Sequence, residues 1–261
     1  AANGGGGAAE PAFGQDHHAG HAVAGIGQQA EGMRHAGSLA ARARPVDVSR
    51  PAGHSARTED QHEETMRITI LGAGGFLGRK LAARLAGDGT LGGQPVTALT
   101  LFDLNVPPAP EAAFPIRRIA GDLGDATSLS QAIPEGTDVV FHLAAVVSAA
   151  AEADFDLGMK VNLYGTLALL DVCRRLPKPP RVIFTSSVAS FGGGQQAMVP
   201  DDGRQVPSNS YGAQKAMGEL LLQDASRKGF LDAVSIRLPT VIVRPGRPNK
   251  AASSFVSGIV R

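Results

Sequence analysis

The chain has 261 residues, of which 43% are hydrophobic, and 25 lysines and arginines face 24 aspartates and glutamates. The apolar share is large enough for a globular core, and the balanced charge gives no electrostatic reason to expect a nucleic-acid partner. A single cysteine, Cys173, excludes an internal disulfide and a multi-cysteine metal site. No apolar run has the length of a membrane span or the form of a secretory signal. We therefore expect a cytoplasmic protein that contacts no membrane.

The composition changes near Met66. Residues 1–65 contain the run Gly4–Gly7, one aromatic residue and no apolar period, so they cannot bury enough surface to offset their ordering entropy. We interpret them as a disordered, low-complexity extension, upstream of a natural start at Met66 or added to it. The cluster of His17, His18 and His21 suggests a metal-binding tract, but no cysteine or spaced carboxylates accompany it, so no metal site is expected.

Residues 66–261 alternate short β-branched runs with amphipathic stretches, which is typical of a parallel sheet covered on both faces. In the first helix Leu77, Leu81 and Leu85 recur every four residues and predict one apolar stripe. Residues 162–176, which include Cys173 as a buried apolar residue, and 211–227 show similar periodicity. The expected fold is α/β, a Rossmann-like doubly wound parallel sheet. The predicted strands are 67–71, 97–103, 118–120, 138–143, 181–186 and 233–238.

The first strand is followed by a glycine pattern, G-x-x-G-x-x-G, formed by Gly72, Gly75 and Gly78. The first glycine permits a tight turn, the second lets backbone approach a pyrophosphate, and the third lets helix and strand pack closely. Phe76 and Leu77 open the helix, whose N-terminal N–H groups can bind phosphate. Because strand, glycines and helix occur in the required order, the pattern predicts dinucleotide binding rather than an ordinary turn.

The second strand ends in Asp103, where a carboxylate can accept hydrogen bonds from the adenosine ribose. A carboxylate there repels a 2′-phosphate, and no arginine follows at the next two positions, so NAD is favoured over NADP as the cofactor. The alternative for Asp103 is an aspartate that only caps the following turn.

Two later motifs indicate an enzyme. Tyr211 and Lys215 are four residues apart at the start of a helix, so their side chains share one face. A free phenol has a pKa of about 10, and lowering it by about three units requires roughly 4 kcal/mol. An ammonium at about 4 Å supplies an energy of that order in a partly screened site. Lys215 can thus activate Tyr211 as a base and also hold the cofactor ribose.

The strand at 181–186 runs into Thr185, Ser186 and Ser187, whose hydroxyls can hydrogen-bond a substrate hydroxyl or carbonyl. The carboxyl ends of parallel strands are where ligands bind in this fold. Each motif alone is common by chance, but their occurrence together, after a dinucleotide pattern, favours a catalytic site.

In these motifs the chain resembles the extended short-chain dehydrogenases/reductases, the NAD-dependent epimerase/dehydratase family, over residues 66–261. The resemblance implies that Asp122 and Leu123 contact the adenine, and that Asn162 supports the Lys215 network. It favours Ser187 as the catalytic, substrate-binding hydroxyl, with Ser186 as the alternate. The resemblance also implies that the cofactor contacts include Leu143, Ala144, Ala145, Tyr211, Lys215 and Pro239.

Within the family the chain is similar to members that oxidise the C2 hydroxyl of a small sugar acid, and Arg244 or Lys250 can bind the substrate carboxylate. Two other functions stay open: a nucleotide-sugar epimerase or dehydratase, and a non-catalytic NAD-sensing module. Relatives commonly form homodimers through a helix pair. The last residues, 259–261, resemble the interior of a helix, so we expect an incomplete C-terminal substrate lobe and weak activity.

Overall fold

The computed structural model describes residues 65–192, 198–200 and 202–240. All of them belong to the second of the two units into which the chain divides, Glu59–Arg261. The predicted disorder of residues 1–65 and the helix expected at residues 259–261 lie outside the described residues, except for residue 65 itself.

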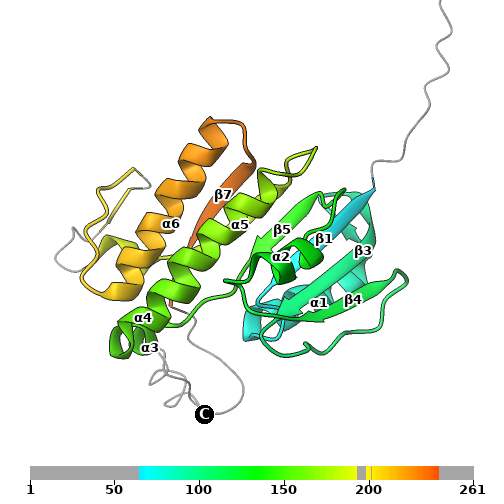
Figure 1. Ribbon diagram of the computed structural model, residues 1–261, viewed down its shortest axis with the longest axis horizontal. Coiled ribbons are helices and arrows are strands. Elements are labelled where there is room, and N and C mark those ends of the chain that lie inside the picture. Colours follow the sequence, from blue (N-terminus) through cyan, green and yellow to red (C-terminus); the bar gives the residue numbers. More distant parts are fainter. Residues whose placement is uncertain (1–64, 193–197, 201, 241–261) are drawn as a thin grey trace, which may run out of the picture. The chain divides into compact units, whose positions relative to one another are not determined.

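The described residues form a sheet in the order β2-β3-β1-β5-β6-β7, and β4 also pairs with β3 (Figure 1). All pairs are parallel except β2 with β3. The strands are β1 (Met66–Leu71), β2 (Thr90–Leu91), β3 (Gln94–Asp103), β4 (Ile116–Ala120), β5 (Val139–His142), β6 (Arg181–Ser187) and β7 (Asp232–Leu238).

This strand order confirms the predicted doubly wound sheet. The chain starts in the middle, at β1, and reaches one edge through β3 and β4 before it crosses back to β5, β6 and β7. All six predicted strands are present, and within the described residues the two-residue β2 is the only strand that was missed. The order of the strands reverses between β1 and β5, and the crevice at the carboxyl ends of such strands is where this fold binds ligands.

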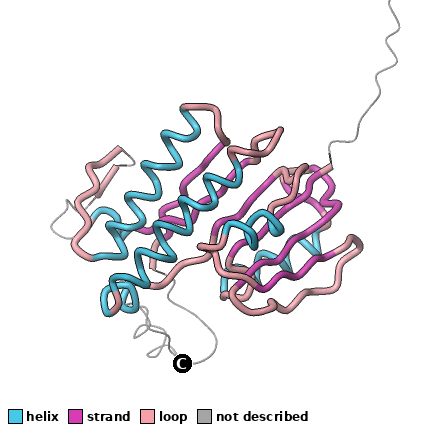
Figure 2. The backbone as a smooth tube through the Cα atoms, in the orientation of Figure 1, coloured by secondary structure: helices cyan, strands magenta, loops and turns pink. Residues whose placement is uncertain are grey.

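Helices cover both faces of the sheet (Figure 2). Helix α1 packs on the face formed by Ile68 and Ile70 of β1, while α2, α5 and α6 pack on the opposite face. The helices are α1 (Phe76–Asp88), α2 (Ala126–Ala132), α3 (Ser148–Ala153), α4 (Phe155–Gly158), the π-helical η1 (Met159–Tyr164), α5 (Gly165–Cys173), the 3₁₀ turn η2 (Val188–Phe191) and α6 (Ser210–Arg227).

The central strands are nearly continuous apolar runs because both faces of the sheet are buried in the core. Successive β1 residues point to opposite faces, and both faces are buried: Ile70 packs beneath α1, and Leu71 packs beneath α2 and α5. Cys173 is fully buried in α5, as predicted from its place in an apolar helix. Burial raises the pKa of its thiol to about 12, so the thiol stays protonated and unreactive.

The predicted apolar stripe of α1 was partly wrong. Leu85 is buried, but Leu77 is 38% exposed, and the buried positions near the start of the helix are Gly78 and Ala82. Small residues occupy this face because the N-terminal half of α1 lies very close to β1. The larger Leu81 and Leu85, farther along the helix, pack against the same core cluster as Ile68 and Ile70.

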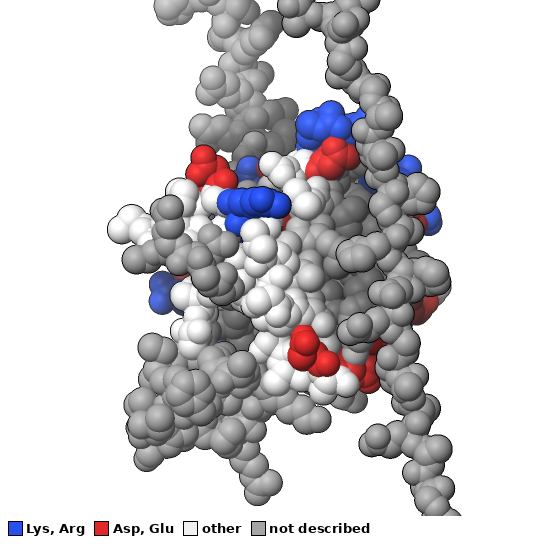
Figure 3. Space-filling view, turned by 90° about the vertical axis from the view of Figure 1, so that its left-hand side faces the viewer, with Lys and Arg blue, Asp and Glu red and all other residues white. Residues whose placement is uncertain are grey.

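The surface carries charges of both signs. On the side of the molecule drawn in Figure 3, blue and red side chains lie near one another, and uncharged residues fill most of the described surface between them. Exposed ion pairs such as Arg84–Asp88 are of this kind and contribute little to stability. None of the helices in the described ranges has the length and apolar character required to span a bilayer.

Candidate functional site

The glycine-rich loop joins the end of β1 to the start of α1. Gly72 has a φ of 87°, a left-handed conformation that favours glycine, and its N–H donates to the carbonyl oxygen of Phe102 at 2.9 Å. Gly75 is the N-cap of α1, and no side chain caps this helix. The N–H groups of the first turn, at Phe76 and Leu77, therefore have no capping side chain, and such helix N-termini are sites that bind phosphate.

Close backbone contacts at this loop leave no room for a side chain. A Cβ atom on Gly72 would lie 2.5 Å from the Ala144 nitrogen, and one on Gly78 would lie 2.2 Å from the Gly72 carbonyl oxygen. The N–H of Leu143 donates to the Leu71 carbonyl at 2.9 Å and holds the segment after β5 against the loop. The predicted cofactor segments at Gly72–Gly78 and Leu143–Ala145 thus lie side by side, and this cradle fits the diphosphate of a dinucleotide.

Asp103 lies at the carboxyl end of β3, next to the same loop. One carboxylate oxygen accepts a hydrogen bond from the Gly74 N–H at 2.8 Å, and the other accepts one from the Leu104 N–H at 2.7 Å. The carboxylate therefore fixes the position of the glycine loop as well as lying where a ribose would be bound. The turn-capping interpretation accounts for only one of these two contacts.

Asp122 and Leu123 follow β4 and differ in their environments. Leu123 is buried against α5, whereas Asp122 is at the surface and accepts hydrogen bonds from Lys160 Nζ at 2.7 Å and from the Gly124 N–H at 2.9 Å. The hydrogen bond from Lys160 is the main cause that lowers the pKa of the Asp122 carboxyl. Asp122 is thus held ionised and can accept a hydrogen bond from an adenine amine.

Asn162 lies in the π-helical turn η1 and connects two other segments. Its amide oxygen accepts from the Val146 N–H at 2.8 Å, and its amide nitrogen donates to the Val146 carbonyl at 3.0 Å and to Gln214 Oε1 at 2.7 Å. Gln214 directly precedes Lys215 on α6. Asn162 therefore links the segment after β5 to the helix that carries the predicted catalytic pair, and π-helical turns often occur at such sites.

Tyr211 and Lys215 lie in the first two turns of α6. The Asn209 side chain caps this helix by accepting from the Gly212 N–H at 2.8 Å, and Glu152 accepts from the Ser210 N–H at 2.8 Å. These two contacts fix the turn in which Tyr211 stands. Lys215 Nζ lies 5.7 Å from the centre of the Tyr211 ring, so the predicted sharing of one helix face is observed.

Lys215 lies on the side of α6 that faces β6 and is almost fully buried, with 1% of its surface exposed. Its Nζ donates to the Thr185 carbonyl at 2.8 Å and lies 4.6 Å from the centre of the Phe184 ring. Burial lowers the pKa of the Lys215 ammonium to about 7, and the Glu219 carboxylate acts in the opposite direction. Burial and the charge of Lys215 also lower the pKa of His142, to about 3.

Replacing Lys215 by methionine is expected to change how stability depends on pH. Between about pH 7 and 10.5 the unfolded chain binds a proton at Lys215 that the folded chain has lost, so this lysine makes stability rise with pH. The rise amounts to several kcal/mol, at about 1.4 kcal/mol per unit of pKa. Urea unfolding at a series of pH values measures it. In Lys215→Met this part of the slope disappears, and an identical slope in both proteins would contradict the low pKa.

The two candidate serines at the end of β6 occupy different positions. Ser186 is 2% exposed and donates a hydrogen bond to Glu219 on α6. Ser187 is only partly buried, and its hydroxyl oxygen accepts from the Ala189 N–H at 3.1 Å. The Ser187 hydroxyl retains its proton to donate, whereas that of Ser186 is used within the protein.

The remaining predicted residues lie near or beyond the end of β7. Leu238 pairs with Ser187, so the exposed Pro239 follows at the same carboxyl end of the sheet. Arg244 and Lys250, the candidates for binding a substrate carboxylate, lie outside the described residues. Within residues 65–192, 198–200 and 202–240, no group of three or more histidine, cysteine, aspartate or glutamate side chains is arranged to hold a metal ion.

Two charged residues near the site were missed from the sequence. Lys160 pairs with Asp122, and Glu219 accepts hydrogen bonds beneath the catalytic helix. Glu219 had a detectable signal, because it lies four residues after Lys215 and eight after Tyr211 and so shares their helix face. Lys160 had none, because its partner is 38 residues away in the sequence.

Comparison with known proteins finds a matching family model and several similar proteins. Residues 68–261 match the model of the NAD dependent epimerase/dehydratase family. D-erythronate dehydrogenase of Cupriavidus necator is 56% identical over 200 residues, 75% of this chain and 61% of that protein. The D-erythronate dehydrogenase of Haemophilus influenzae is 45% identical, with the same coverage. The crystal structure of a nucleoside-diphosphate-sugar epimerase from Agrobacterium tumefaciens is 47% identical, with a TM-score of 0.71 over 80% of this chain and 63% of that one.

The chain spans about three fifths of the length of these relatives. The matched part contains the glycine loop, Asp103, Asn162, Tyr211 and Lys215, and the fold is the predicted one. NAD is the cofactor that the family description names. From the match over residues 68–261 and the sheet order, the chain belongs to the NAD-dependent epimerase/dehydratase family.

Proposed function

We propose that the chain acts in an NAD-dependent dehydrogenase that oxidises D-erythronate to 2-dehydro-D-erythronate at its C2 hydroxyl. The observation that carries this proposal is the 56% identity to a D-erythronate dehydrogenase across the whole nucleotide-binding fold. The tyrosine, lysine and serine needed for such an oxidation are all present at the carboxyl end of the sheet and the start of α6.

The proposed chemistry moves one hydride and one proton. The glycine loop and Asp103 would hold NAD, which would supply the acceptor for the hydride from C2 of the sugar acid. Tyr211 accepts the proton of the C2 hydroxyl, and Ser187 donates a hydrogen bond to the same oxygen as it becomes a carbonyl. Lys215 stabilises the ionised form of Tyr211 by its charge and, through its hydrogen bond to Thr185, stays at the end of β6. Arg244 or Lys250 would bind the substrate carboxylate.

A nucleotide-sugar epimerase is the second candidate, favoured by the 47% identity to the Agrobacterium tumefaciens structure. Such an enzyme uses the same base and cofactor but returns the hydride to its substrate. It therefore produces no net NADH.

Incubation of the purified chain with NAD and a panel of four-carbon sugar acids and nucleotide sugars distinguishes the two functions. We expect NADH absorbance to increase with D-erythronate only. Because the chain spans three fifths of its relatives, a version extended to their full length is measured beside it, and we expect the 261-residue chain to bind NAD but turn over slowly. Epimerised nucleotide sugar without NADH would support the second candidate and exclude the first.

We also propose that two copies pair through the outer faces of α5 and α6. Leu167, Met217 and Leu220 on these helices are 38%, 37% and 60% exposed and line one apolar groove with Leu170 and Phe230. An exposed apolar surface of this kind favours a second copy, which would cover it symmetrically. A sedimentation mass equal to that of one chain would exclude the homodimer.

We propose the cytoplasm as the compartment. The single thiol, at Cys173, is buried and remains free, which suits a reducing environment. Fractionation of cells that express the protein tests this assignment.

A further inference from the structure

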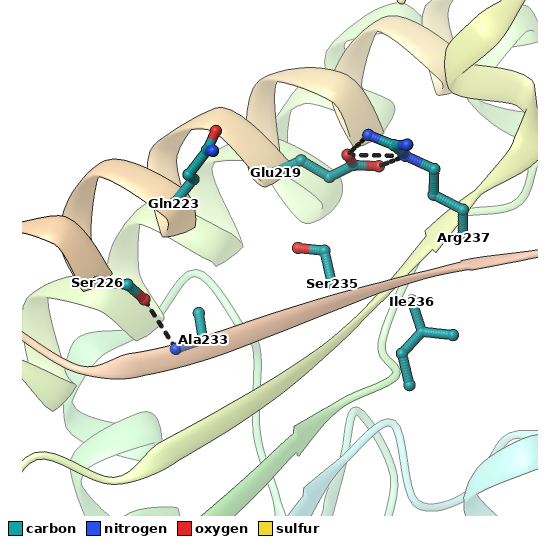
Figure 4. Close-up of a pocket in the computed structure, with 7 residues that line it drawn as sticks. All are labelled: Glu219, Gln223, Ser226, Ala233, Ser235, Ile236 and Arg237. Atoms are coloured by element: carbon teal, nitrogen blue, oxygen red, sulfur yellow. Dashed lines mark hydrogen bonds and ion pairs between the residues drawn. The ribbon is translucent and has the colours of Figure 1, made fainter. Parts of the chain in front are cut away.

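The Glu219 carboxylate is the point at which several elements around the proposed site are joined. It accepts hydrogen bonds from Ser186 at the end of β6, from Gln205 at 2.9 Å and from Arg237 at the end of β7. Arg237 contributes two nitrogens, with its Nη2 at 2.7 Å and its Nε at 3.0 Å from the same carboxylate oxygen. Figure 4 shows Glu219 and Arg237 reaching toward each other across the space between α6 and β7.

Glu219 is buried, with 7% of its surface exposed. Burying a carboxylate is costly unless hydrogen-bond donors replace the lost water, and Ser186, Gln205 and Arg237 are these donors. Arg237 also lies over the Phe191 ring, 4.6 Å from its centre, so the same pair holds the turn η2 that follows Ser187. The Glu219–Arg237 ion pair therefore lies next to the end of β6 and to the turn η2.

Two of the three residues that donate to Glu219, Ser186 and Arg237, are close in sequence to a residue of the proposed site. Ser186 directly precedes Ser187, and Arg237 comes two residues before Pro239. Glu219 itself lies on the same helix face as Tyr211 and Lys215. Its contact with Ser186 therefore fixes the distance between the strand that carries the substrate-binding hydroxyl and the helix that carries the base.

Glu219 is also a negative charge one helical turn after the buried ammonium of Lys215 on α6. The titratable groups around Lys215 are Tyr211 and Glu219 on its own helix, and His142 on β5. On β7, Arg237 is the ion-pair partner of Glu219. His142 is uncharged at neutral pH, so the Glu219 carboxylate is the group that offsets the burial of Lys215.

We propose that Glu219 is a positioning residue: through Ser186 it sets the place of Ser187 relative to Tyr211, and through its charge it favours the protonated form of Lys215. This role rests on the proposed dehydrogenase function for its first half. The second half, the charge of Lys215, concerns the protein itself and holds whichever reaction the site performs.

Glu219→Gln tests the charge. NMR of protein labelled with ¹³C at the lysine ε-carbons follows the titration of Lys215, whose signal is identified by its loss in Lys215→Met. We expect Lys215 to titrate at lower pH in Glu219→Gln than in the wild type. The rising limb of the pH profile of kcat changes with it, and kcat falls by about a hundredfold.

Glu219→Asp tests the position. The shorter side chain keeps the charge but withdraws from Ser186, so Lys215 should titrate near the wild-type pH while kcat remains low. Asp232→Asn is the matched control. It removes another acid–arginine pair between β6 and β7, Arg181–Asp232, which is exposed and lies at the opposite end of these strands. Neither the Lys215 titration nor kcat should change in this control.

A double variant, Glu219→Gln with Arg237→Gln, covers the case in which the single variant does not fold, because it removes both members of the ion pair and leaves no unpaired guanidinium at Arg237. A Lys215 titration and a kcat equal to wild type in the folded Glu219 variants would overturn the proposal. A shifted titration with wild-type kcat would overturn the positioning of Ser187. Failure of the wild type to oxidise any sugar acid would count against the proposed function instead, and the NMR titration would still decide the effect of Glu219 on Lys215.

Discussion

Replacing Tyr211 by phenylalanine is expected to reduce kcat by about a thousandfold while the Kd for NAD stays the same. The substitution removes only the phenol oxygen, and positioned general acid–base groups contribute about 10² to 10⁴ in rate. The ring keeps its packing at the start of α6, and the cradle around Gly72 does not include it. Steady-state kinetics on the full-length version and calorimetric titration of NAD measure the two quantities.

The sequence provides a matched control, because it contains one other tyrosine. Tyr164 lies in the π-helical turn η1 and is 55% exposed, so its hydroxyl is in water and Tyr164→Phe should leave both quantities unchanged. Unchanged turnover in Tyr211→Phe would remove the proposed base. A loss of NAD affinity in the same variant would mean that Tyr211 acts mainly in binding.

The parts of the site that were predicted from the sequence are those built from neighbouring residues. The glycine loop, with strand before and helix after it, is recognisable within Met66–Asp88, although Asp103 and the segment after β5 also hold it in place. The spacing of Tyr211 and Lys215 fixes their common helix face without knowledge of the rest of the fold. The doubly wound parallel sheet followed from the alternation of strands and helices along the chain.

Features that depend on contacts between distant segments were not predictable. The family resemblance favoured Ser187 over Ser186, but which serine faces α6 depends on the register of β6 against that helix, and spacing alone does not fix it. The packing of α1 depends on how closely Gly78 lets it approach β1, so periodicity alone placed Leu77 on the wrong face. The partner of Glu219, Arg237, comes from a strand 18 residues later.

Gly78→Ala is expected to abolish NAD binding and to destabilise the fold. The new Cβ would lie 2.2 Å from the Gly72 carbonyl oxygen and 2.6 Å from the Ala73 Cα. Both atoms are backbone, so relief requires α1 to move away from β1, which costs about 1–3 kcal/mol as overpacking. The same movement displaces the helix N-terminus from the loop that would bind the diphosphate. Urea unfolding and calorimetric titration of NAD measure the two effects.

Gly87→Ala, near the end of the same helix, separates this steric effect from the general preference of helices for alanine. A Cβ atom on Gly87 would meet nothing within 4 Å, so the substitution should raise stability by several tenths of a kcal/mol and leave NAD binding unchanged. If Gly78→Ala bound NAD as tightly as Gly87→Ala, the close approach of α1 to β1 would not be what forms the cofactor site. The diphosphate would then have to be held elsewhere, and the roles assigned to Gly72, Asp103 and the uncapped end of α1 would fail together.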